Sequence, residues 1–212
     1  MPFQSLKDLY IDQLRDLYDA EQQIAQAMPR MIKASSSPDL KQTFQTHLDE
    51  TKFQVERLDL IFKKLGQSPG GRHCRGIEGN IAAGTELIQE GSAPDVSDAA
   101  IIASAQRVEH YEMAGYGCAR TFADRLNDSY ASELLQQTLD EEETADHLLT
   151  NLAEGGINQS ASEGKELRGS RLTFVSGGEF AGQDFTDVRI VGAANDDLGR
   201  VDGFVLDRNS GR

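Results

Sequence analysis

Five glutamates stand at helical positions where an apolar side chain is expected, and they are the residues best placed to do chemistry. They are Glu21, Glu50, Glu109, Glu112 and Glu142. At about 100° per residue, Glu21 and Glu112 fall near the centres of apolar faces. Glu109 and Glu142 fall within such faces, and Glu50 lies on a shoulder. Burial of an unpaired carboxylate is costly, so an acid at such a position needs a partner, a proton or a metal ion.

These acids also lie at matching depths in two predicted helical hairpins. Two residues of a hairpin are level when they are about equally far from its turn. Glu21 precedes the first predicted turn by about 15 residues and Glu50 follows it by about 14, an offset of one helical rise of about 1.5 Å. Around the second turn, Glu112 lies about 16 residues before and Glu142 about 14 after. We therefore expect one layer of carboxylates across the bundle, with Asp146 one turn further along.

A carboxylate-rich layer between facing helices is typical of a pair of bridged iron or manganese ions. For any single glutamate, a solvated or salt-bridged residue at the edge of a face is the simpler interpretation. For the acids taken together, the metal interpretation is favoured.

The histidines do not follow the Glu-x-x-His step that ferritin-like carriers place on two helices. Phe53 and Ala145 stand three residues after Glu50 and Glu142. His110 and His147 project away from the apolar faces and are predicted to lie on the surface. His47, one turn before Glu50, either orients that carboxylate or fills the core, and the sequence leaves both interpretations open.

The elements that must position these acids are predicted from apolar residues at steps of three and four. Two helices form an antiparallel hairpin: residues 4–34, with a kink or early end expected at Pro29, and a second helix that begins in the run SSSPDL and stops at Gly66. A glycine-rich loop over residues 66–79 leads to a short crossover helix at about 80–90. A second hairpin follows, whose first helix is capped by Asp95 or Ser97. Its second helix, residues 129–154, ends at Gly155 and Gly156. The pattern predicts a mainly α fold, a ferritin-like four-helix bundle with an extra short crossover helix.

The last part of the chain has a different pattern. Short segments rich in β-branched and aromatic residues, RLTFVSG, FTDVRIVGA and RVDGFVLD, are separated by Gly, Asp and Asn and predict three strands. We therefore divide the chain into a bundle over residues 1–157, a linker over 158–170 and a short β-rich segment over 171–212.

Composition narrows the classes of function. The chain has 212 residues, with 35 acidic and 21 basic side chains and a net charge of −14, which disfavours nucleic acid and anionic membrane surfaces as partners. No apolar run has the length of a membrane span, and the N-terminus lacks the pattern of a signal peptide. We expect a cytoplasmic protein. Cys74 and Cys118 lie in no zinc or disulfide motif, so reduced thiols are expected.

Four runs resemble the corresponding helices of the YciF/YciE-like bacterial stress proteins, a ferritin-like family: LKDLYIDQLRDLYDAEQQI, HLDETKFQVERLDLIF, QRVEHYEMAGYG and LLQQTLDEEETADHL. The resemblance covers about residues 4–155. It implies a four-helix core with a short extra helix, a homodimer and a dinuclear metal site. The acids of that site would correspond to Glu21, Glu50, Glu109, Glu112, Glu142 and Asp146.

The run DVRIVGAANDDLGRVDGFVLDRNSGR resembles the opening of a PRC-barrel domain. Half of such a barrel leaves strand edges open, so we expect the segment to pack on the bundle, pair with a second copy or another protein, or stay partly disordered.

Two functions follow from the sequence. The first is a stress-associated redox protein, in which paired iron or manganese ions react with dioxygen or peroxide and so consume oxidant or oxidise iron. The second is a non-catalytic dimeric stress or interaction protein whose acids pair with one another or bind a structural ion. The acids support the metal site but not turnover, so the sequence leaves open whether the protein is an enzyme.

Overall fold

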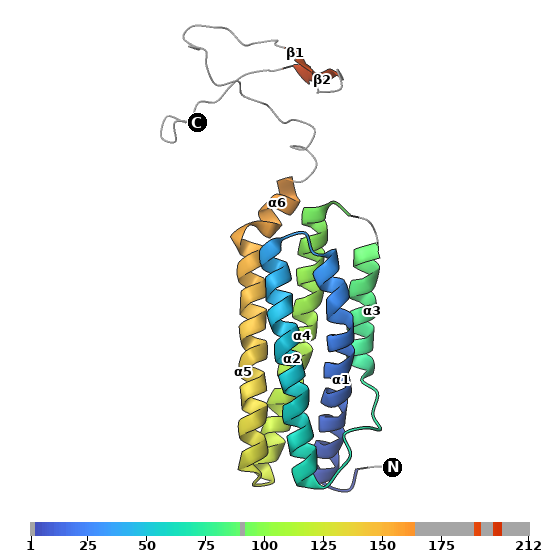
Figure 1. The fold of residues 1–212 in the computed structure, drawn as a ribbon, viewed down its shortest axis with the longest axis vertical. Coiled ribbons are helices and arrows are strands. Elements are labelled where there is room, and N and C mark those ends of the chain that lie inside the picture. Colours follow the sequence, from blue (N-terminus) through green and yellow to red (C-terminus); the bar gives the residue numbers. More distant parts are fainter. Residues whose placement is uncertain (1–2, 90–91, 164–188, 192–196, 201–212) are drawn as a thin grey trace, which may run out of the picture. The chain divides into compact units, whose positions relative to one another are not determined.

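The computed structural model describes residues 3–89, 92–163, 189–191 and 197–200. The chain divides into two compact units, Met1–Ser162 and Glu163–Arg212. The first unit holds four long helices: α1 (Leu6–Ala34), α2 (Pro38–Leu65), α4 (Pro94–Arg125) and α5 (Ser129–Leu152). Contacts of α1 with α2 and of α4 with α5 form two hairpins, and contacts of α1 with α4 and of α2 with α5 join the hairpins into a bundle (Figure 1). The predicted four-helix fold is confirmed.

The crossover helix α3 (Arg75–Gln89) packs against α4 and α1 (Figure 1). It begins earlier than the predicted residue 80. Asp19 accepts a hydrogen bond from the Cys74 backbone amide at 2.8 Å and so anchors the start of the helix. A Cβ on Gly76 would lie 2.4 Å from Cε2 of Tyr111. The glycine that suggested a loop is therefore needed for close packing of α3 on α4.

Three other predicted boundaries also change. The first helix does not end early at Pro29 but continues to Ala34. Helix α4 starts at Pro94, where a proline at the first helical position needs no backbone donor, so Asp95 and Ser97 lie inside its first turn. After α5, a π-helical turn (Ala153–Ile157) and α6 (Asn158–Glu163) continue the chain, and Gly156 at φ 151° supplies the change of direction.

Helix ends elsewhere follow the expected chemistry. Ser5, Ser37 and Asp128 accept hydrogen bonds from backbone amides in the first turns of α1, α2 and α5. Gly66, with φ at 63°, ends α2 in the left-handed conformation.

The core of the bundle consists of two apolar clusters. One contains Ile24 of α1, Phe44 of α2 and Ile101 of α4. The other contains Leu14 of α1 and Phe62 of α2.

On α4, about two turns that carry buried glutamates separate Val108 of one cluster from Tyr116 of the other. On α5, the buried Glu142 lies between Leu135 of one cluster and Leu149 of the other.

Within the second unit, β1 (Arg189–Val191) and β2 (Asp197–Arg200) form an antiparallel pair with a register shift between Ile190 and Val191. β1 lies within the second predicted strand, and β2 ends at Arg200, the first residue of the third. The first predicted strand and most of the segment that resembles a PRC-barrel domain lie outside the described residues. Among the described helices, none is both long and apolar enough to cross a membrane.

Candidate metal centre

Ionisable side chains from all four long helices meet between the two apolar clusters. The group comprises Glu21 from α1, His47 from α2, Glu109 and Glu112 from α4, and Glu142 from α5, and we call it the acid layer. None of the five is more than 4% exposed. The Glu109–Glu112 pair, three residues apart on α4, places two carboxylates on one helical face.

Four members of the acid layer bring ligand atoms close to one another. One ligand atom from each of His47, Glu109, Glu112 and Glu142 lies within 4.8 Å of the other three. His47 Nε2 is 3.4 Å from Glu109 Oε2 and 3.6 Å from Glu142 Oε2. Because imidazole and carboxylate are both ligands of iron and manganese, this donor set suits such an ion.

The fifth member, Glu21, is fixed by a hydrogen bond from the hydroxyl of Tyr116, which binds Oε1. Its other oxygen, Oε2, has no hydrogen-bond partner among the described residues. The charges of Glu112 and Glu142 act on Glu21, so the three carboxylates form one electrostatic group.

Glu142 is held in the same way from the α2 side. Gln54 Nε2 donates to Glu142 Oε1 at 2.6 Å and to Glu141 Oε2 at 3.1 Å. Arg57 fixes Glu141 in turn through two hydrogen bonds of 2.5 and 2.6 Å. The second oxygen of Glu142 has no hydrogen-bond partner in the described part of the chain. Glu21 and Glu142 thus each keep one oxygen available, with the other one committed.

The two remaining acids of the predicted set lie outside this group. The Glu50 side chain is 39% exposed, and its Oε2 is 3.6 Å from His47 Nδ1. Asp146 accepts a hydrogen bond from Gln106 at 3.1 Å and lies 3.5 Å from the exposed His110. The structure therefore brings Glu21, Glu109, Glu112 and Glu142 together and places Glu50 and Asp146 at the edge.

The sequence did not assign His47 to the ligand set, although it left a role beside Glu50 open. The structure places its imidazole between Glu50 on one side and Glu109 and Glu142 on the other. The available signal was a histidine on an apolar face at the depth of the glutamates. His110 and His147 are exposed, as predicted.

Burial shifts the acid–base properties of the whole layer. Loss of solvation raises the pKa of Glu21 to about 8, and the charge of Glu142 adds to the shift. Loss of solvation likewise raises the pKa of Glu109 to about 8. It also holds the pKa values of Glu112 and Glu142 well above their usual range. For His47, burial acts against the charged form, but hydrogen bonding and charge from the surrounding carboxylates raise its pKa overall. Without a cation, protons must balance the charge of these acids.

The unsatisfied atoms of the layer show whether the residues fit a metal. Buried polar atoms normally have partners, and each exception needs an explanation. Within the described residues, the atoms without a hydrogen-bond partner include Glu21 Oε2, both nitrogens of His47, Glu109 Oε2, both oxygens of Glu112 and Glu142 Oε2. These atoms belong to the acid layer, whereas Tyr10 Oη, Gln54 Oε1 and Arg120 Nε, which also lack partners in the described part of the chain, lie outside it. The convergence of the acid-layer atoms is what a cation site requires, and the residues fit one.

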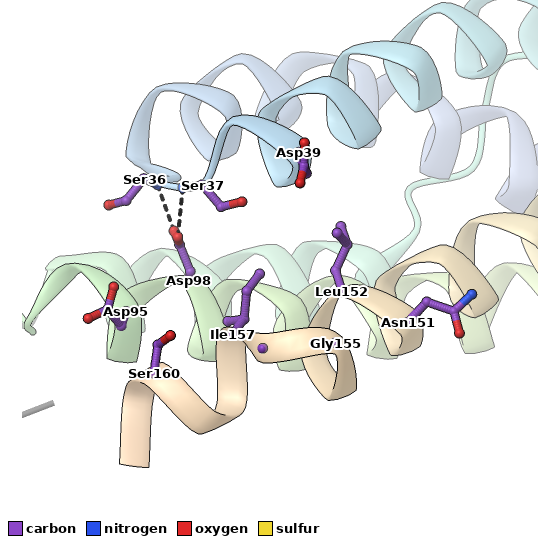
Figure 2. Close-up of a pocket in the computed structure, with 11 residues that line it drawn as sticks. Ser36, Ser37, Asp39, Asp95, Asp98, Asn151, Leu152, Gly155, Ile157 and Ser160 are labelled. Atoms are coloured by element: carbon purple, nitrogen blue, oxygen red, sulfur yellow. Dashed lines mark hydrogen bonds between the residues drawn. The ribbon is translucent and has the colours of Figure 1, made fainter. Parts of the chain in front are cut away.

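A pocket of about 390 Å³ lies at the end of the bundle near the turn between α1 and α2 (Figure 2). Its most buried acid is Asp98, which is 3% exposed. Both Asp98 oxygens accept hydrogen bonds from backbone amides, from Ser36 at 2.7 Å and from Ser37 at 2.8 Å (Figure 2). This carboxylate ties the first hairpin to α4, so its role is structural.

Comparison with known proteins gives one family. Residues 5–162 match the model described as "Domain of unknown function (DUF892)". Protein YciF of Escherichia coli (strain K12) is 39% identical over 162 residues, covering 76% of this chain and 98% of the relative.

Solved structures agree with this match. The crystal structure of the E. coli stress protein YciF has a TM-score of 0.72 at 38% identity, covering 74% of this chain and 99% of that one. YcfI of Rhodopseudomonas palustris, described only as a candidate structural protein, has a TM-score of 0.68 at 45% identity over 69% and 94% of the chains. A Xanthomonas campestris protein at 18% identity, with a TM-score of 0.60 over 75% and 97%, supports the fold alone.

Proposed function

We propose that this chain, which belongs to the DUF892 family and is a YciF-like stress protein, binds a pair of iron or manganese ions in the acid layer and uses them to handle oxidants or iron. The observation that carries the proposal is the set of buried, unpartnered ligand atoms that converge from four helices. No other group of the described residues combines such burial with so many unused ligand atoms.

Charge supports two divalent ions rather than one. Glu21, Glu109, Glu112 and Glu142 carry four negative charges when ionised, and two divalent cations neutralise them without protons. His47 then serves as a neutral nitrogen ligand. Glu50, which lies beside His47 at the edge of the layer, is an additional carboxylate.

When bound, such ions would supply one-electron redox chemistry towards dioxygen or peroxide. This chain's residues have supporting roles. Tyr116 and Gln54 orient Glu21 and Glu142 through hydrogen bonds. The two apolar clusters exclude water, and carboxyl groups with raised pKa values release protons when a cation replaces them.

Metal content and reactivity test this function. The protein is purified without chelators from iron- and manganese-replete cells, and metal is measured in the wild type, Glu112→Ala and Glu143→Ala. We expect about two ions per chain, loss of metal in Glu112→Ala and no change in Glu143→Ala, which alters an exposed glutamate of α5. Ferrous oxidation and peroxide consumption are then followed. A wild type free of metal contradicts the proposal.

The alternative is a non-catalytic homodimer in which the same layer holds a structural ion. The absence of Glu-x-x-His steps favours it, as do exposed apolar side chains on the outer sides of α2 and α5. These are Phe53, Leu60, Tyr130 and Leu148. Sedimentation of the full chain tests the dimer: Phe53→Ser with Leu60→Ser should yield a monomer if this face is the interface. Bound metal with no reaction towards dioxygen or peroxide supports this alternative.

The β-rich segment enters the proposal only as an interaction module. We propose that it pairs with a second copy or with another protein, because a pair of short strands is marginal by itself. The compartment that we propose is the cytoplasm.

A further inference from the structure

Two small neighbouring cavities lie beside the acid layer. The inner one, about 20 Å³, is bounded by His47 and Glu109. The outer one, about 40 Å³, lies between α1, α3 and α4 and extends to the exposed Arg30. Four residues line both cavities, which are therefore adjacent, and we call the region that these residues border the passage: Ala27, Met31, Ile81 and Val108.

The walls of this passage are apolar. In the outer cavity the hydroxyl of Thr85 is already used, because it donates to the Ile81 carbonyl oxygen of its own helix at 2.8 Å. A buried water needs two to four polar partners, and apolar cavities stay dry while admitting xenon or hydrocarbons. The passage therefore suits a small apolar molecule better than water or a charged one.

The crossover helix α3 determines the geometry of the passage. A Cβ on Gly84 would lie 2.2 Å from Ser104 Oγ, so glycine lets α3 approach α4 closely at this point. Beside this contact the small side chain of Ala27 on α1 faces the gap. Because α3 lies close to α4 at Gly84 and Ala27 is small, the neighbouring side chains do not fill the space between the helices.

We infer that the two cavities form an access path through which dioxygen, a small apolar molecule, reaches the His47 and Glu109 side of the acid layer. A reaction of dioxygen at the acid layer rests on the proposed function, whereas the binding of a small apolar molecule in the cavities does not. The inference selects between the oxidants left open above, because hydrogen peroxide is polar and gains little from an apolar passage.

Xenon is the direct probe of the path, since it occupies apolar cavities and needs no metal. Crystals of the full-length, metal-free protein are pressurised with xenon, and we expect a xenon atom in the outer cavity of the wild type. Ala27→Leu, which fills the passage, should lose it. Ala83→Leu, the same change on the exposed side of α3, should retain it.

Reactivity of the iron-loaded protein supplies the second measurement. At equal iron content, Ala27→Leu should slow oxidation by dioxygen at least tenfold and leave oxidation by peroxide within twofold. Ile81→Ala, which widens the passage, should increase the dioxygen rate. This second variant also keeps the test decisive if Ala27→Leu fails to fold.

The outcomes separate this inference from the proposed function. A wild type that binds neither iron nor manganese refutes the metal function, and with it the use of the path, whatever xenon shows. If either metal is bound, an absence of xenon in the wild type overturns the inference and leaves the metal function standing. Dioxygen rates unchanged in both Ala27→Leu and Ile81→Ala overturn it in the same way.

Discussion

The same four helices build two apolar clusters and, between them, the acid layer, but the two kinds of region contribute opposite terms to stability. Leu14 and Phe62, in one cluster, are no more than 1% exposed, and their burial stabilises the fold. Glu21 and Glu142 are equally buried, and their burial costs free energy unless a proton or cation neutralises them.

The position of the layer explains how the bundle tolerates it. On α1, apolar Leu17 and Ile24 flank Glu21, and on α4, apolar Ala105 and Tyr116 flank the two glutamates. Packing above and below therefore holds the backbone in place whether or not the layer is neutralised. The difference teaches that the fold and the candidate site depend on different residues: the clusters specify the bundle, and the layer supplies the residues that could hold a metal ion.

The largest expected effect concerns pH, which acts on the layer and not on the clusters. Burial raises the pKa of Glu21 and Glu109 to about 8 in the folded protein, against about 4.5 when unfolded. Between these pH values the folded form binds more protons than the unfolded form. The contribution of these carboxyl groups to the free energy of unfolding is therefore fully present below about pH 4.5 and is lost as the pH rises towards 8. The expected slope is about 1.4 kcal/mol per pH unit for each excess proton.

Urea unfolding of chelator-treated protein from pH 5 to 8 measures this slope. Glu112→Gln, which cannot ionise, should flatten the curve, whereas Glu143→Gln, at an exposed position, should not. A stability that rises over this range would show that the acids are ionised in the metal-free protein.

Truncation in a cluster should affect the metal-free and metal-bound protein alike. Phe62→Ala removes a ring that is 1% exposed and should lower the free energy of unfolding by about 3 to 5 kcal/mol. Phe53→Ala, on the same helix but 57% exposed, should change it by no more than about 0.5 kcal/mol if the protein is monomeric. Denaturant unfolding with and without metal measures both. If metal alone restored the free energy of unfolding of Phe62→Ala to the wild-type value, the separation of the two regions would be contradicted.

The sequence predicted most of this arrangement because helical periodicity is a local signal. The four long helices were found from apolar spacing, and the four buried glutamates stood out because they interrupt it. What it missed depends on contacts distant in the chain. Gly76 suggests a loop in the sequence, and only its packing against Tyr111 explains it within a helix. The start of α3 at Arg75 follows a hydrogen bond from the Cys74 amide to Asp19, which is distant in the chain. The role of His47 stayed open because its angular position on the helix does not show which imidazole nitrogen faces which carboxylate.

A substitution that turns one acid into an apolar residue should reverse the usual cost of a core mutation. Glu112→Met keeps a similar volume and removes a carboxylate whose two oxygens have no hydrogen-bond partner among the described residues. We expect the metal-free protein at pH 8 to gain about 1 to 4 kcal/mol in the free energy of unfolding and to lose metal binding. Thermal and urea unfolding with parallel metal analysis measure both changes. Destabilisation without metal would mean that Glu112 has a structural role.

The smallest expected effect comes from a residue that touches the layer without belonging to it. Gln54 Nε2 holds Glu142 Oε1 at 2.6 Å, so Gln54→Leu should leave the ligands in place but free Glu142 to rotate. Loss of such an orienting hydrogen bond typically weakens metal binding by about 10- to 100-fold. Gln45→Leu, at an exposed position of α2, is the matched control. Competition with a chelator of known affinity measures the change.

Because Gln54 also bonds Glu141, which Arg57 holds independently, the fold should survive the substitution. Equal metal affinities in the two variants would show that helix packing alone orients Glu142. Gln54 would then contribute nothing to the candidate metal site, and only the ligands themselves would determine metal affinity.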